Sequence, residues 1–124
     1  MLKNKKTLDL STAKGLRVFY RSYNHFFYGD RLPENVVVHF EKLEYQPDGD
    51  AANLTFTGEG LDAVVDIAVD ERLRGMDCVV AWLLTHEMNH VDLIMRGLTR
   101  TQHGPKFDAG MLRLAKSGGL NGIW

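Results

Sequence analysis

The chain has 124 residues, of which 44% are hydrophobic and 25% charged, and its formal net charge is −1 at pH 7. This length suits one domain with one hydrophobic core, so we expect a single domain over residues 1–124, with a loose basic lead-in at 1–7 and a tail at 118–124. The near-neutral charge excludes a global basic field that would draw the whole protein to nucleic acid or anionic membrane. The single cysteine, Cys78, excludes an internal disulfide and a cysteine-based zinc ribbon.

The sequence carries no signal for export or membrane insertion. Its N-terminus is charged but has no apolar segment behind it, so it does not have the form of a signal peptide. The longest apolar run is far shorter than the ~20 residues that a membrane-spanning helix needs. We therefore expect a cytoplasmic protein with no membrane partner.

The first predicted element is a long amphipathic helix over residues 9–28. Its apolar side chains recur at intervals of three and four, which places them on one helical face: Leu16, Phe19, Tyr20, Tyr23, Phe26 and Phe27. Core packing is the favoured interpretation of this aromatic face, and a binding surface is the alternative. His25 lies off the stripe and is expected in solvent. Gly29 suits a left-handed helix end, and Pro33 cannot continue a helix.

Three strands are expected next, over residues 35–41, 52–57 and 63–69. In the first and third, alternate residues share the face toward the core: Val36, Val38, Phe40, Val65, Ile67 and Val69. The opposite face of these strands is expected to carry Val37, His39, Val64, Asp66 and Ala68. Because turn signals leave only short connections, we expect an antiparallel meander.

Polar residues on these strands are candidates for a site, but a structural role is favoured for each. His39 can ligate a metal only if its face of the sheet meets that metal. Asp62, Asp66 and Asp70 are expected on a solvated face rather than in a ligand cluster. One of the three can still orient a ligating histidine through a hydrogen bond.

A central helix is predicted over residues 78–96, because a long apolar run is bounded by helix-end signals. Asp77 is a suitable N-cap, Gly97 suits the position after the helix, and Arg96 complements the negative end of the helix dipole. Cys78 is expected to be buried and inert.

This helix contains the strongest chemical signal of the chain, since residues 86–90 read His-Glu-Met-Asn-His. Residues four apart lie on one face of a helix, so His86 and His90 can share one small cation. Zinc accepts imidazole nitrogens and keeps a position open for water in catalytic sites. Glu87 leaves the helix about 100° from His86, where it can take a proton from that water. The alternative is that the histidines are ordinary core residues, which would leave several buried polar groups to be satisfied.

A third histidine follows at a loop–helix junction. His103 precedes Gly104, which allows a tight turn, and a short helix predicted over residues 105–116. That helix has an apolar face: Phe107, Met111 and Leu114. A chain that turns back here can bring His103 to the open side of the histidine pair. The tail after this helix is expected to pack on the body or to dock on a partner.

Together these motifs resemble those of the SprT-like metallopeptidases, which include the Spartan proteases. The resemblance rests on residues 86–90, on His103-Gly104-x-x-Phe107 after a gap of twelve residues, and on the stretch over residues 23–33, where a helix ends in an aromatic residue, a glycine and a Leu-Pro pair. It covers roughly residues 16–114, with the two histidine motifs as its specific part.

The resemblance implies an α+β, zincin-like fold with a long N-terminal helix, a three-stranded mainly antiparallel sheet, an active-site helix and a short C-terminal helix. It implies one catalytic Zn²⁺ held by His86, His90 and His103, with Glu87 as general base, in an enzyme that hydrolyses protein substrates. We expect such a substrate to lie along the sheet edge beside the third strand. Members of the family act on proteins bound to or crosslinked with DNA.

Two other interpretations stay open. One is a non-catalytic adaptor, in which zinc stabilises a zincin fold that binds a protein partner. The other adds DNA as a partner, through the basic N-terminus and a basic patch: Arg96, Arg100, Lys106 and Arg113. Such a patch is more often a solvated face.

Overall fold

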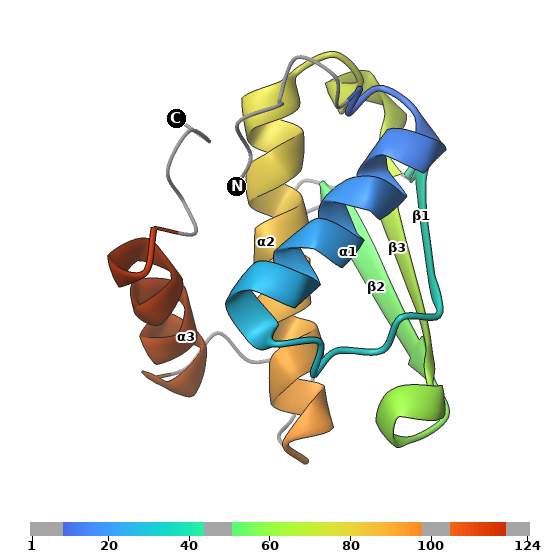
Figure 1. Ribbon diagram of the computed structural model, residues 1–124. Coiled ribbons are helices and arrows are strands. Elements are labelled where there is room, and N and C mark those ends of the chain that lie inside the picture. Colours follow the sequence, from blue (N-terminus) through green and yellow to red (C-terminus); the bar gives the residue numbers. More distant parts are fainter. Residues whose placement is uncertain (1–8, 44–50, 98–104, 119–124) are drawn as a thin grey trace.

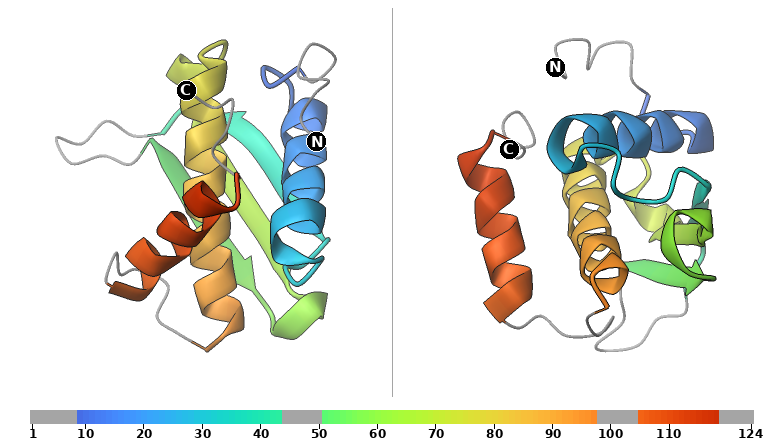
Figure 2. Two further views of the ribbon diagram at one scale, coloured as in Figure 1. Left: turned by 60° about the vertical axis from the view of Figure 1, so that its left-hand side comes forward. Right: turned by 60° about the horizontal axis from the view of Figure 1, so that its bottom comes forward.

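The computed structural model describes residues 9–43, 51–97 and 105–118. Its elements are α1 (Ala13–Tyr28), β1 (Val36–Glu41), β2 (Ala52–Thr57), the short 3-10 helix η2 (Gly60–Asp62), β3 (Val64–Asp70), the 3-10 helix η3 (Glu71–Leu73), α2 (Asp77–Met95) and α3 (Pro105–Lys116). Helices α1 and α2 cover one face of the sheet, and α3 lies on the side of α2 away from it (Figure 1; Figure 2). The described residues therefore form an α+β fold, as the sequence predicts.

The sheet is mixed rather than mainly antiparallel, and the predicted meander is wrong. Its strand order is β1-β3-β2, with β1 parallel to β3 and β2 antiparallel to β3. Strand periodicity identifies the faces of a strand but not its neighbours, and the connection over residues 42–51 is long enough to carry the chain past the position of β3. The last strand in the chain, β3, thus lies at the centre of the sheet.

The register aligns the apolar faces of all three strands. Val38 lies beside Ile67, and Leu54 lies on the other side of Ile67. Most of the core-facing strand residues are buried under α1 and α2: Val36, Val38, Ala52, Phe56, Val65, Ile67 and Val69. Ala68, expected to face solvent, is also buried, because its small side chain lies between its register neighbours His39 and Asn53.

Helix α1 begins at Ala13, later than the predicted start at residue 9. The Thr12 hydroxyl accepts a hydrogen bond from the Gly15 amide at 3.0 Å, which makes Thr12 the N-cap. The Asp9 carboxylate accepts a hydrogen bond from the Ser11 amide at 2.9 Å, so residues 9–11 form a non-helical turn before α1. Because these backbone amides already have local side-chain partners, the helix does not extend to residues before Ala13.

The predicted apolar face of α1 is largely confirmed. Leu16, Phe19, Tyr20 and Tyr23 are buried, and Phe27 is partly buried. Phe26 is the exception, because it lies at the edge of the stripe, is 58% exposed and packs its ring against the exposed His25.

The end of α1 is fastened to the chain that follows it. Gly29 adopts the left-handed conformation expected of it, with φ 57°. The buried amide of Asn24 bonds both backbone groups of Leu32, donating to its carbonyl at 3.0 Å and accepting from its amide at 3.1 Å. The Tyr20 hydroxyl donates to the Pro33 carbonyl at 2.8 Å. These bonds fix the direction in which the chain enters β1.

Helix α2 runs close to its predicted bounds, but its first turn differs from expectation. Asp77 is the first helical residue rather than the N-cap, and Met76 precedes it without a side-chain cap. Cys78 is exposed, not buried, because it lies with Val79 on the side of the first turn that faces away from the core, whereas Val80 in the same turn is buried. No helix among the described residues combines the length and hydropathy that a membrane crossing needs.

Burial of three tyrosines predicts an alkaline limit to stability. Burial raises the pKa of Tyr20, Tyr23 and Tyr28 well above the ordinary value of 10.0. Their neutral forms therefore stabilise the fold fully below pH 10, and this contribution is lost above it, because the unfolded chain ionises first. Absorbance at 295 nm should show these three titrating together with the loss of far-UV circular dichroism. Three reversible titrations near pH 10 in a folded chain would contradict the burial.

Candidate metal centre

Helix α2 brings His86 and His90 together on one face. Their ring centroids are 5.0 Å apart, and the ring planes are inclined by 72°. His90 is buried at 5% exposure, whereas His86 is partly exposed. One side of the pair therefore remains closer to solvent, as a site that admits a substrate requires.

Aromatic rings pack against the pair from two directions. Trp82, one turn earlier on α2, lies 5.1 Å from His86 between ring centroids. Phe107, in the first turn of α3, lies 4.8 Å from His86 and 4.5 Å from His90. These contacts restrict the imidazole orientations and make the surroundings of the pair apolar.

Glu87 follows His86 directly and is buried, with 8% of its surface exposed. Its side chain leaves α2 about 100° from that of His86. A buried carboxylate is costly unless charged or hydrogen-bonding groups compensate it. Helix α2 therefore carries a buried carboxylate one position after His86.

The structure describes two of the three predicted zinc ligands, His86 and His90. Two imidazoles on one helical face are donors that zinc prefers. Within residues 9–43, 51–97 and 105–118, no three His, Cys, Asp or Glu side chains gather closely enough to hold a metal ion. His103, the third predicted ligand, lies outside these ranges.

The other predicted candidates on the strands have structural roles. The His39 Nε2 lies 2.8 Å from the Asp66 Oδ1, on the face of the sheet opposite to α2. Asp70 is buried and accepts hydrogen bonds from Arg72, which hold the pKa of its carboxyl below the ordinary value. Asp62 is exposed. Asp62 and Asp66 thus reach solvent as expected, but the expectation of a solvated face is wrong for Asp70, whose bonds with Arg72 compensate its burial.

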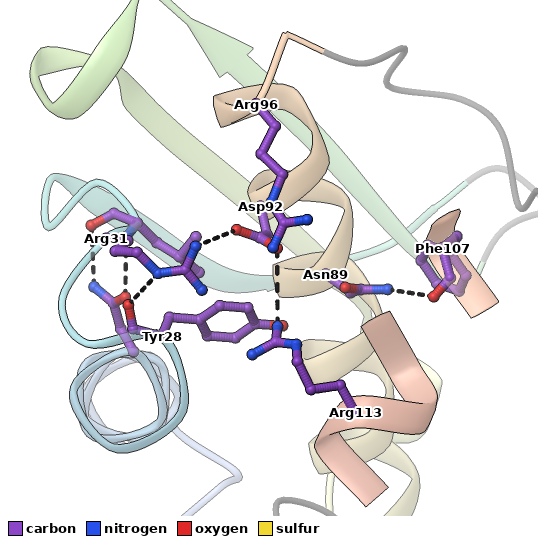
Figure 3. A network of polar contacts seen from close by, with 9 residues as sticks. Tyr28, Arg31, Asn89, Asp92, Arg96, Phe107 and Arg113 are labelled. Carbon is purple, nitrogen blue, oxygen red and sulfur yellow. Dashed lines mark hydrogen bonds and ion pairs between the residues drawn. The ribbon is translucent and has the colours of Figure 1, made fainter. Parts of the chain in front are cut away.

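A second polar cluster lies elsewhere on α2, around Asp92. This carboxylate is 3% exposed, and three arginines from three parts of the chain approach it (Figure 3). The shortest nitrogen–oxygen distances are 3.4 Å for Arg31, 3.0 Å for Arg96 and 3.9 Å for Arg113. Two of the predicted patch arginines are therefore directed at a carboxylate, while Arg100 lies outside the described residues.

The Asp92 cluster lies where the C-terminal parts of three helices approach one another. The guanidinium groups of Arg31 and Arg113 also lie over the ring of Tyr28, 5.8 and 5.5 Å from its centroid. Tyr28 ends α1, Asp92 belongs to α2 and Arg113 to α3. Burial is the main cause of the raised pKa of Tyr28, and the Asp92 carboxylate adds to it.

Sequence reasoning did not identify Asn24, Asn89 or Asp92 as important. Each is a polar residue with at most 2% of its surface exposed. The sequence signals such a residue by a short polar side chain within a helical apolar pattern, but this pattern does not identify the residue that bonds it. Most of those partners lie outside the helix of the residue: Leu32 for Asn24, Phe107 for Asn89, and Arg31 and Arg113 for Asp92 beside the local Arg96.

Comparison of the chain with protein-family models, with curated proteins and with solved structures found no match in any of the three.

Replacing Asp92 by Asn should destabilise the protein by about 1–3 kcal/mol, because the buried charge that gathers three arginines is lost while their mutual repulsion stays. Urea unfolding of the two proteins measures this. Glu71→Gln is a matched control, since Glu71 pairs with Arg74 but is 59% exposed, and it should change stability by at most about 0.5 kcal/mol. Equal effects of the two substitutions would contradict the role given to Asp92.

Proposed function

We propose that the protein is a zinc-dependent endopeptidase of the SprT-like kind. His86, His90 and His103 hold one zinc ion in this proposal, and Glu87 is the general base. The observation that carries it is the pair of imidazole rings 5.0 Å apart on one face of α2, with a buried carboxylate at the next position. His103 is included as the third ligand because of its spacing in the sequence.

The chemistry divides between the metal and the protein. Zinc, when bound, lowers the pKa of a coordinated water and polarises the scissile carbonyl. Glu87 accepts the proton of the attacking water and later delivers it to the leaving amine. Trp82 packs against His86, and Phe107 packs against both imidazole rings, which keeps the ligands oriented for one position of the metal.

The topology changes the expected place of the substrate. β3 is paired on both sides, so a polypeptide cannot add beside it as the sequence suggested. β2 pairs with β3 along one side and packs against α2, which makes its other side the better edge for an extended substrate. DNA contact would depend on the basic N-terminus, Arg100 and Lys106, because Arg96 and Arg113 pair with Asp92.

Metal content tests the ligand set. Wild type purified without chelator should carry about one zinc per chain by plasma mass spectrometry, and His86→Ala and His103→Ala should lose most of it. His25→Ala is the matched control, because His25 is exposed and pairs with Asp30. Full zinc retention in His103→Ala would remove that residue from the site.

Cleavage tests the role of Glu87. Glu87→Gln should retain zinc and lose cleavage of an unfolded protein substrate by at least about 100-fold, because the base is removed while the ligands remain. Mass spectrometry of the fragments measures this. If both proteins bind zinc and neither cleaves any protein, the adaptor interpretation replaces the peptidase. Equal cleavage by both would show that another group is the base.

A further inference from the structure

Asn89 lies between the two histidines in the chain and is fully buried. Its Nδ2 donates a hydrogen bond to the carbonyl oxygen of Phe107 at 3.0 Å (Figure 3). The acceptor is in the first turn of α3, so this bond joins α2 to α3 directly. A buried amide held in this way fixes distance and direction, which apolar contacts alone do not.

Gly110 of α3 provides the space that Asn89 needs. A Cβ atom built on Gly110 would lie 2.3 Å from the Asn89 Oδ1 and 3.0 Å from its Cγ. Glycine inside a helix costs about 1 kcal/mol relative to alanine, so this position weakens α3 by itself. The loss is offset here because only glycine lets α3 approach the amide this closely.

The hydrogen bond to Phe107 and the close contact with Gly110 both attach the same turn of α3 to Asn89. Phe107 and Gly110 are three residues apart, so they lie on the same side of the helix, and both meet the Asn89 amide. The ring of Phe107, whose carbonyl is held, contacts both His86 and His90. The position of that ring against the histidines therefore follows from the register of α3 on α2.

Other contacts attach α3 without setting this register. Leu114 is fully buried, and Arg113 approaches Asp92 only to 3.9 Å. An apolar side chain and a loose ion pair tolerate a small shift or rotation of the helix. The Asn89 hydrogen bond and the Gly110 contact do not tolerate such a shift. A displacement of about 1 Å would break the hydrogen bond and open or overlap the packed contact.

We propose that Asn89 is a positioning residue of the metal site. Its amide fixes α3 on α2 and so holds the Phe107 ring against the two imidazoles, which sets their orientation toward the metal. Asn89 acts through Phe107 and does not touch the metal. This inference rests on the proposed zinc site.

Zinc affinity, measured by competition with a chromophoric chelator, tests the inference on the full chain. Asn89→Ala should weaken zinc binding by about 10-fold or more, the size of effect known for residues that orient metal ligands. Asn89→Asp keeps the size of the side chain but loses the donor, so it should weaken binding to a similar extent. The cobalt-substituted protein should show an altered visible spectrum in both variants.

Two controls separate positioning from general stability. Val80→Ala removes a buried side chain from α2 near its other end, so it should lower the thermal unfolding temperature but leave zinc affinity within about 2-fold of wild type. Asn53→Ala removes an exposed asparagine from β2 and should change neither. Metal-free samples of every variant are compared by thermal unfolding.

A double-variant cycle tests the shared contact. Gly110→Ala alone should weaken zinc binding, because its new Cβ collides with the Asn89 amide. In Asn89→Ala/Gly110→Ala that collision is absent, so the combined loss should be smaller than the product of the single losses. Strictly multiplicative losses would overturn the common origin of the two effects. If Gly110→Ala does not fold while the double variant does, the rescue supports the same contact.

The outcomes distinguish this inference from the proposed function. If wild type binds zinc and Asn89→Ala and Asn89→Asp bind it equally well, the inference is overturned and the proposed zinc site stands. If wild type binds no zinc when it is offered, the proposed function is overturned and the inference falls with it.

Discussion

Every polar side chain on a buried helix needs a compensating partner, and this requirement on α2 organises much of the fold. Helix α2 packs against the sheet, α1 and α3. It nevertheless carries five buried polar residues: Thr85, Glu87, Asn89, His90 and Asp92. Burying such groups without partners would cost several kcal/mol in total, a large part of the stability of a small domain. The partners therefore determine which elements can lie beside α2 and in what register.

The partners range from the same helix to distant segments. Thr85 bonds within the helix, to the Trp82 carbonyl at 2.8 Å. Asn89 bonds α3, and Asp92 pairs with Arg96 at the end of its own helix, with Arg31 after α1 and with Arg113 of α3. Apolar contacts supply most of the favourable free energy of such a core but carry little direction. The polar groups of α2 supply the direction, so they select one arrangement of the three helices.

The features that the sequence predicts well are those with a local cause. The bounds of α3, Pro105–Lys116, agree with the prediction because Pro105 suits the first turn of a helix. The positions of Gly29 and Gly97, with φ 57° and 77°, follow from the backbone freedom of glycine. The shared face of His86 and His90 follows from the helical repeat.

The features that it does not predict depend on partners far away in the chain. Alternation in β1 identified the buried Val36 and Val38, but it could not show that β3 would pair with β1 in parallel. The apolar run after Cys78 suggested burial, yet burial depends on which side of α2 the other elements cover, since Val80 in the same turn is buried. The Asn89 contact with Gly110 has no signature in either segment alone, because each residue is explained only by the other.

The histidine pair lies on α2 where this helix meets α3. One of its aromatic neighbours, Trp82, belongs to the same helix and is placed by helical geometry alone. The other, Phe107, belongs to α3, and among the described elements α3 makes its main contacts with α2 only (Figure 2). A helix attached along one side keeps its register only through specific contacts. A change at the Asn89 contact therefore reaches the imidazoles through the Phe107 ring. A hydrogen bond of fixed direction suits this position better than additional apolar surface, which tolerates sliding of α3.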